Sequence, residues 1–156
     1  MKKEIERKFT VTGDFRKGIL RSYRIAQGYL SSVPERIVRI RIKEDKAFIT
    51  IKGPCDPLGV IRDEWEKEIS ITDAEKLLNF CEPGILYKIR HEIRVGKHIF
   101  EVDEFLGRNE GLFIAEVELS EANESFEKPS WIGKEVTGDK RYYSAYITSH
   151  PYTEWQ

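Results

Sequence analysis

The sequence has 156 residues, of which 40% are hydrophobic, enough for one globular domain with a sizeable core. Its 26 basic and 27 acidic residues give a net charge of −1, which excludes a global field that attracts nucleic acid or a membrane surface. The 2 cysteines lack Cys-x-x-Cys spacing and exclude a disulfide framework, and no stretch is apolar enough to span a bilayer. We therefore predict a single domain over residues 1–156, located in the cytoplasm, with neither nucleic acid nor membrane as a partner.

The first nine residues predict a strand with one charged and one apolar face. Glu4, Glu6 and Lys8 alternate with Ile5 and Phe9, so the two sets point to opposite sides. Two carboxylates about 7 Å apart on one face repel each other, and a divalent metal between them would resolve the conflict. An edge strand that carries charge to prevent aggregation explains these nine residues equally well.

Seven further strands are predicted, most of them with charges on one face only. They cover residues 22–30, 36–44, 47–53, 60–71, 86–95, 98–105 and 115–119. The clearest period of two is found in 36–44, where Val38, Ile40 and Ile42 alternate with basic side chains.

Helices are predicted in two places. A capping box from Thr72 to Glu75 begins a helix that runs through Phe80 and ends before the next proline. The chain after the last predicted strand is expected to be helical, with one turn at 120–125 and an amphipathic helix at 139–148.

The charged strand faces are compatible with two architectures. An antiparallel sheet with helices on its back would expose the polar face to water. Eight strands are also enough to close a barrel around one small ligand. We favour the second, a mainly β (α+β) fold in which an eight-stranded antiparallel closed barrel has its apolar faces outside, beneath the helices, and its charged faces around a polar lumen.

The side chains predicted to line this lumen form a basic and an acidic set. The basic set comprises Lys8, Arg39, Arg41, Lys52, Lys88 and Arg90. The acidic set comprises Glu4, Glu6, Glu64, Glu66, Asp103, Glu116 and Glu118. A mutually neutralised salt-bridge core explains these sets less well than a ligand that meets both, because burying so many ions costs more than their pairs return.

The two sets together favour phosphate chemistry. Several converging arginines and lysines suit a ligand with multiple phosphates. Carboxylates that cannot touch such a polyanion can hold Mg²⁺ or Mn²⁺ through their oxygen atoms. Water activated by the metal near a terminal phosphorus, with cations that stabilise the developing charge, amounts to phosphoanhydride hydrolysis.

The segment Glu4-Ile-Glu6-Arg-Lys8 matches an E-x-E-x-K signature, and the other charged segments follow it in a familiar order. They are Arg39-Ile-Arg41, Thr50-Ile-Lys52, Arg62 to Glu66, Lys88-Ile-Arg90, Glu101-Val-Asp103, Ala115 to Glu118 and the ending Gly133 to Tyr143. With these motifs the chain resembles the CYTH superfamily, the triphosphate tunnel metalloenzymes, over nearly its whole length.

This resemblance implies a tunnel that holds a triphosphate end-on between basic residues and a divalent cation. Glu4, Glu6 and Glu118 would bind the metal, with Glu116 close by and Asp103 as a further candidate. The residues implied to hold phosphates are Lys8, Arg39, Arg41, Lys52 and Arg90, and Tyr29 would also face the tunnel. Lys88 would bind phosphate or donate a proton to the leaving group, and Glu64 and Glu66 would bind a second metal or orient water.

The short bacterial relatives that this sequence resembles imply that inorganic tripolyphosphate is hydrolysed to pyrophosphate and phosphate, and they make a homodimer possible. The same superfamily includes thiamine triphosphatases, RNA triphosphatases, polyphosphate polymerases and class IV adenylate cyclases. A cyclase that converts ATP to cyclic AMP and a non-catalytic polyphosphate-binding module therefore remain open as alternatives. A lipocalin-like carrier of an apolar ligand is disfavoured, because the lumen would be charged.

Overall fold

The computed structural model of the protein describes residues 1–155, so that Gln156, the last residue of the predicted domain, lies outside the described part. Within it, nine strands belong to one sheet. These strands are β1 (Lys2–Val11), β2 (Ile19–Ser31), β3 (Ile37–Lys43), β4 (Lys46–Lys52), β5 (Ile61–Ile69), β6 (Leu86–Val95), β7 (His98–Phe105), β8 (Phe113–Glu118) and β9 (Ile132–Glu135). The α-helices are α1 (Ile71–Leu78) and α2 (Ser144–Ile147), and short 3-10 helices span Arg16–Gly18, Gly107–Asn109, Lys140–Tyr142 and Tyr152–Glu154.

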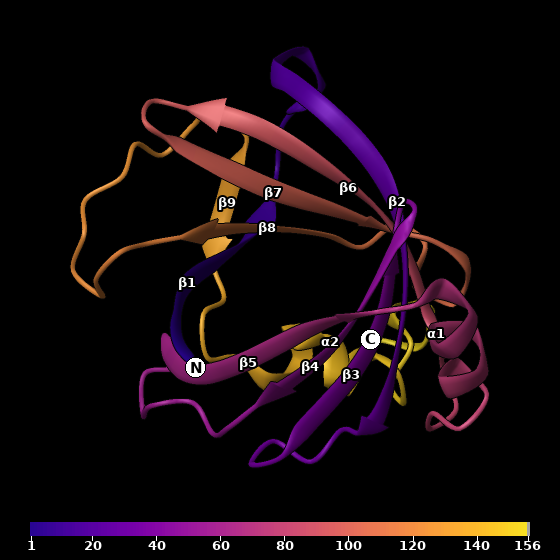
Figure 1. Cartoon of the computed structure of the whole chain (residues 1–156). Helices are drawn as coiled ribbons and strands as arrows, with labels where there is room; N and C mark the ends of the chain where they lie inside the picture. Colours follow the sequence, from indigo (N-terminus) through magenta and orange to yellow (C-terminus); the bar gives the residue numbers. More distant parts are fainter. Residues whose placement is uncertain (156) are drawn as a thin grey trace.

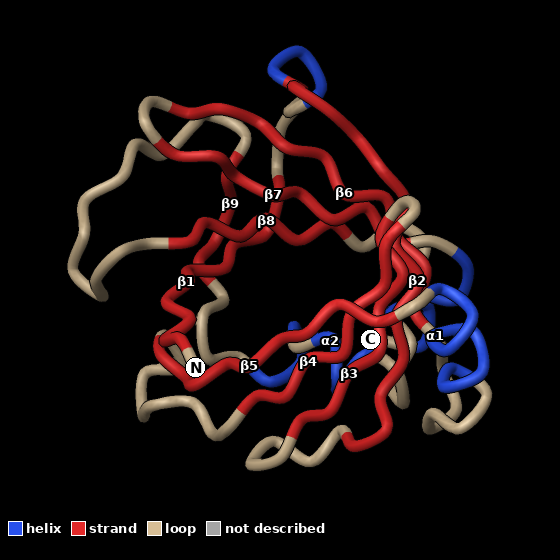
Figure 2. Tube along the Cα trace, viewed as in Figure 1, coloured by secondary structure: helices blue, strands red, loops and turns tan. Residues whose placement is uncertain are grey.

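Eight of these strands close into an antiparallel barrel in the order β5-β4-β3-β2-β6-β7-β8-β1. The first strand closes the ring because it has partners on both edges: Lys2–Ile5 pair with β5, and Glu6–Thr10 pair with β8. Figures 1 and 2 show the strands surrounding a central space, which we call the bore. The predicted closed barrel is confirmed.

The outer wall of the barrel carries most of the apolar core. Beneath α1, Ile40 and Ala47 pack with Ala74 of the helix. On the opposite side, Phe100 and Val117 belong to a larger apolar cluster that is covered by the chain around Trp131 rather than by a helix. The regular alternation along β3 therefore has the predicted sense, with Ile40 outside and the arginines inside.

One end of the bore is closed by apolar side chains. Leu86, Phe105 and Ile114 lie two residues from Lys88, Asp103 and Glu116 respectively, so they share the inward face of their strands. They pack against Ile147 of α2, and Tyr142 and Trp155 complete this cluster. Figure 1 shows the consequence, since α2 lies within the outline of the ring while α1 lies outside it.

The chain after β8 differs from its prediction. Residues 132–135 form a ninth strand, which pairs with β1 at Phe9 and Val11, where a helical segment was expected. The predicted turn at 120–125 is a hydrogen-bonded turn without helix, in which Glu124 accepts from Ser120. The predicted helix at 139–148 is interrupted at Tyr143, whose extended backbone separates a 3-10 turn from α2.

The capping box predicted for α1 is also wrong. The N-cap is Ser70, whose hydroxyl accepts a hydrogen bond from the backbone N–H of Asp73 at 3.0 Å, and Thr72 already lies inside the helix. Serine at this position satisfies a free N–H of the first turn in the usual way. In residues 1–155 no helix is both long and apolar enough to cross a membrane.

Candidate active site

A cavity of about 650 Å³ occupies the bore and is lined by charged strand faces. Such a volume lies within the range of about 300–1,000 Å³ that is typical of small-molecule sites. The predicted site residues on its wall are Glu4, Glu6, Lys8, Tyr29, Arg39, Arg41, Lys52, Glu64, Glu66, Lys88, Arg90, Glu116 and Glu118. Only Asp103 of the predicted set lies behind the wall, where it is 1% exposed.

Strand pairing brings four acidic residues together, which we call the acidic group: Glu4, Glu6, Glu116 and Glu118. The register of β1 and β8 places Glu6 opposite Glu118, and Lys8 opposite Glu116. Burial, together with the negative charges of Glu116 and Glu4, raises the pKa of Glu6 well above its usual value. Burial opposes ionisation of Glu116 as well, but the Lys8 ammonium and a hydrogen bond with Glu6 lower its pKa to about 2. At neutral pH this pair therefore favours holding a proton or a cation.

The acidic group has the chemistry of a site for a hard divalent cation. Its donors are carboxylate oxygens, the ligands that Mg²⁺ and Mn²⁺ prefer. Glu6 and Glu116 form a buried pair of like charges, and a bound cation would relieve their mutual repulsion. In residues 1–155 no three His, Cys, Asp or Glu side chains already converge in a metal-binding arrangement. Glu4 instead accepts hydrogen bonds from Lys52 at 2.9 and 3.0 Å.

The same cavity has a basic wall, formed by Arg39 and Arg41 of β3 and by Lys52 of β4, which bonds to Glu4 of the acidic group. Glu66 lies 3.6 Å from the Arg39 guanidinium and 3.7 Å from that of Arg41. Burial, followed by the charges of Arg39 and Arg90, lowers the pKa of Arg41 to about 10. The Nε atoms of both arginines are buried without a hydrogen-bond partner among the described residues. The positive charge and the N–H donors of the basic wall are therefore only partly matched by protein groups, as expected of a site for an anion.

A second ionic cluster lies deep in the bore and consists of Lys88, Arg90 and Asp103. Lys88 donates to Asp103 at 2.7 Å, and Arg90 donates to both oxygens of the same carboxylate at 2.7 and 2.8 Å. Burial lowers the pKa of Lys88 to about 8. Burial opposes ionisation of Asp103 too, but Arg90 and Lys88 hold its pKa below the usual range. Both oxygens of Asp103 are thus engaged as counter-ions of Lys88 and Arg90.

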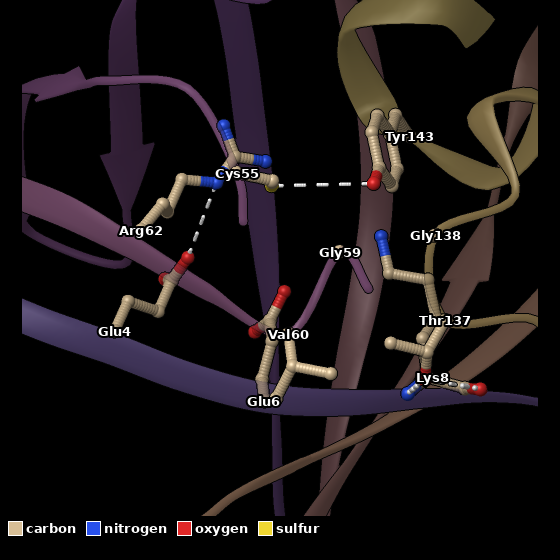
Figure 3. Close-up of a pocket in the computed structure, with 10 residues that line it drawn as sticks. All are labelled: Glu4, Glu6, Lys8, Cys55, Gly59, Val60, Arg62, Thr137, Gly138 and Tyr143. Atoms are coloured by element: carbon tan, nitrogen blue, oxygen red, sulfur yellow. Dashed lines mark hydrogen bonds and ion pairs between the residues drawn. The ribbon is translucent and has the colours of Figure 1, made fainter. Parts of the chain in front are cut away.

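Figure 3 shows a smaller recess beside the acidic group, where Glu4, Glu6 and Lys8 face Arg62 and Tyr143. Two loops meet there with their glycines in contact. Gly59 and Gly138 both have positive φ, and a Cβ on Gly59 would lie 2.5 Å from the Cα of Gly138. Only glycine permits this approach.

The C-terminal segment adds residues to the site that the sequence prediction missed. Lys8 donates to the backbone carbonyl of Tyr142 at 3.1 Å, and its ammonium lies 5.0 Å from the centre of the Tyr143 ring. Lys140 and Tyr143 line the main cavity as well. The ending Gly133 to Tyr143 had carried part of the family resemblance, so a signal for these residues was present in the sequence.

A pH-dependent effect of metal on stability is expected from Glu6. Because its pKa is higher in the folded protein than its usual 4.5, the folded state binds the extra proton. Its contribution to stability is present at low pH and is lost as the pH rises through the raised pKa. We expect the melting temperature of the metal-free protein to fall as the pH rises from the usual carboxylate range toward neutral, and Mg²⁺ to raise it more at neutral than at acidic pH.

The matched variant is Glu6→Gln, which should reduce the fall in melting temperature and remove most of the stabilisation by Mg²⁺. Part of the fall should remain, because burial also raises the pKa of Glu101. Lys88 does not disturb this window, because its ammonium is protonated in folded and unfolded protein until the pH approaches about 8. Equal shifts with Mg²⁺ at both pH values, measured by differential scanning fluorimetry, would contradict the assignment of Glu6 to a cation site.

Comparison with known proteins agrees with this geometry. A model of the CYTH domain matches residues 2–144. The chain belongs to the CYTH family. An inorganic triphosphatase from Acetivibrio thermocellus is 42% identical to this CYTH chain over 157 residues, covering 100% of the chain and 99% of that protein.

Two further relatives extend the comparison. An inorganic triphosphatase from Nitrosomonas europaea is 38% identical over 143 residues, covering 89% of this CYTH chain and 92% of that protein. The crystal structure of an inorganic triphosphatase superposes with a TM-score of 0.67 and 33% sequence identity, covering 95% of each chain. The similarity therefore spans the barrel and its C-terminal segment together.

Proposed function

We propose that this CYTH protein is a divalent-metal-dependent triphosphatase that hydrolyses inorganic tripolyphosphate to pyrophosphate and phosphate. The observation that carries the proposal is that one cavity holds two features: crowded arginines that repel one another and are paired with Glu66, and a buried pair of carboxylates, Glu6 and Glu116, that a cation would stabilise. In a mutually neutralised salt-bridge core, neither the basic nor the acidic set would have an excess of like charge. The names of the relatives support the same activity.

In this proposal the phosphates are bound by cations from four strands. Arg39, Arg41 and Lys52 would contact phosphate oxygens along the basic wall, and Arg90 and Lys8 would do so from the facing strands. Arginine forks match phosphate geometry, and lysines add point charges. Tyr29 lines the same cavity and offers a hydroxyl to a phosphate oxygen.

The acidic group would hold the cation, for which Mg²⁺ and Mn²⁺ are the candidates. A bound divalent cation supplies positive charge to the phosphate oxygens and makes a nearby water more acidic. Asp103 is the least suited of the predicted ligands, because both of its oxygens accept from Arg90 and Lys88. Glu64 and Glu66 line the cavity outside the acidic group, and they are the candidates to orient the attacking water.

Lys88 is suited to proton donation toward the leaving pyrophosphate. Its pKa of about 8 leaves it protonated at neutral pH yet able to release the proton. Hydrolysis adds water across one P–O–P link, so the leaving oxygen gains a proton as the terminal phosphorus gains a hydroxyl. Loss of this proton donor as the pH rises would lower the rate of a Lys88-dependent step.

The remaining parts of the proposal concern the whole molecule. They are a single domain, a cytoplasmic location and a possible homodimer. One family model over residues 2–144 supports the single domain, and the free Cys55 and Cys81 support a reducing compartment. Size-exclusion chromatography with light scattering measures the oligomeric state.

The deciding experiment incubates the purified chain with tripolyphosphate and Mg²⁺ or Mn²⁺, and measures the products by ion chromatography. We expect equal amounts of pyrophosphate and phosphate from the wild type and none from Glu6→Gln. The panel also contains ATP, thiamine triphosphate and pyrophosphate. Absence of phosphate release from tripolyphosphate would refute the proposal. Cyclic AMP from ATP would indicate a cyclase instead, and tight binding without turnover would indicate a polyphosphate-binding module.

A further inference from the structure

Three buried side-chain atoms in residues 1–155 have no hydrogen-bond partner, and they lie on two neighbouring strands. They are Oε1 of Gln27 on β2 and the Nε atoms of Arg39 and Arg41 on β3. The register pairs Gln27 directly with Arg41. Gln27 is 0% exposed and uncharged, and none of the charged-face patterns in the sequence pointed to it.

The unpartnered atoms of Gln27 and Arg41 are complementary. One is a carbonyl oxygen, which accepts hydrogen bonds, and the other is a guanidinium N–H, which donates them. Directly paired residues on adjacent antiparallel strands have their Cβ atoms about 4.5–5.5 Å apart, so side chains of this length reach each other. Both point to the inward face, because Gln27 is two residues from Tyr29, which lines the cavity, as does Arg41.

The orientation of the Gln27 amide follows from Arg41, because the Tyr29 hydroxyl can both accept and donate a hydrogen bond. The amide Nε2 donates to the Tyr29 hydroxyl at 3.2 Å. The carbonyl oxygen is then the atom left for Arg41. In the reverse orientation the amide NH₂ would face the guanidinium, donor against donor, and would leave Arg41 without an acceptor.

We propose that Gln27 is a positioning residue for the triphosphate: with the phosphates in the cavity, its amide oxygen accepts a hydrogen bond from Nε–H of Arg41. This inference rests on the proposed function. Holding Nε from behind leaves the outer two nitrogens of Arg41 to face phosphate oxygens as a fork. One amide thereby ties Tyr29 and Arg41 into a single arrangement across β2 and β3.

The choice of a neutral amide suits a polyanionic ligand. A carboxylate at position 27 would also accept from Arg41, but it would add a negative charge beside the phosphates and offset part of the attraction from the basic wall. Glu66 already compensates Arg39 and Arg41 from the other side, at 3.6 and 3.7 Å. Gln27 orients the guanidinium without further reducing the positive charge that the ligand meets.

The test is a double-mutant cycle on tripolyphosphate hydrolysis. Gln27→Met keeps the length of the side chain and removes the amide, and we expect kcat/KM to fall roughly tenfold, as for a lost hydrogen bond to a charged group. In an Arg41→Lys background, which has no Nε–H at that place, the same substitution should change kcat/KM less than about twofold. Tyr23→Phe, on the inward face of the same strand, is the matched control and should act independently of Arg41→Lys.

The cycle is repeated on binding of tripolyphosphate by calorimetry, so that it does not depend on turnover. An effect of Gln27→Met that is equal in the wild-type and Arg41→Lys backgrounds would overturn the inference while leaving the triphosphatase proposal intact. Absence of hydrolysis by the wild type would overturn the proposed function, and the binding cycle would still test the pairing. If Gln27→Met does not fold, as judged by thermal melting, Gln27→Asn keeps the amide, shortens its reach and enters the same comparison.

Discussion

Substitution of Asp103 by alanine is expected to lower the free energy of unfolding by about 3–5 kcal/mol, the usual cost of removing one partner from a buried ion pair. Asp103 is 1% exposed and is the shared acceptor for Lys88 and Arg90. Without it, Lys88 would lose its ion pair, and Arg90 would retain only Glu101, at 3.2 Å, among the described residues. For a chain of this size the melting temperature should drop by roughly 10 °C.

The matched control is Asp63→Ala. Asp63 also forms a short ion pair, with Lys3 at 2.6 Å, but both side chains are at least half exposed. A surface pair of this kind contributes about 0–1 kcal/mol. Chemical denaturation of both variants measures the difference. A cost for Asp103→Ala no larger than that for Asp63→Ala would show that the cluster of Lys88, Arg90 and Asp103 does not stabilise the fold.

Substitution of Arg41 by alanine is expected to have the opposite profile, with a large loss of activity and no loss of stability. The guanidinium lies in the basic wall, and removing a donor that stabilises phosphate charge should reduce kcat/KM by about 100- to 1,000-fold. Its own burial and the neighbouring charges of Arg39 and Arg90 already disfavour its charged form, as its lowered pKa indicates. Its removal relieves that repulsion, so the melting temperature without ligand should stay constant or rise.

Arg24→Ala provides the control, because Arg24 lies on the neighbouring strand with an exposed side chain. It should leave both kcat/KM and the melting temperature nearly unchanged. Kinetics with tripolyphosphate and thermal melting without ligand separate the two effects. A clear fall in the melting temperature of Arg41→Ala would mean that this arginine is needed for the fold.

The sequence was most informative where a strand has a single solvent or ligand face. The strict alternation along β3 predicted which side Arg39 and Arg41 occupy, because one residue of slippage would exchange the two faces. The same reasoning applied to β1 and β8, and it predicted that most of the candidate residues share one cavity.

Patterns of one strand could not predict features that depend on distant contacts. β9 has only four residues and one of them is Gly133, so no alternation marks it, and its pairing with β1 decides its conformation. The charged inward faces of β6, β7 and β8 end in apolar residues, namely Leu86, Phe105 and Ile114. The switch from charged to apolar side chains is explained only by the packing of Ile147 against them. Gln27 was missed because an amide carries no charge pattern, and its importance depends on which atoms remain unpartnered after folding.

The double pairing of β1 has a consequence for how the protein is made. Lys2–Ile5 can pair with β5 once residue 64 has been made, but Glu6–Thr10 pair with β8 and must wait until residue 118. Contacts of such large sequence separation form slowly, and an unpaired strand edge is prone to aggregation in the meantime. The ring of strands therefore closes only late in synthesis, once β8 has been made and pairs with β1.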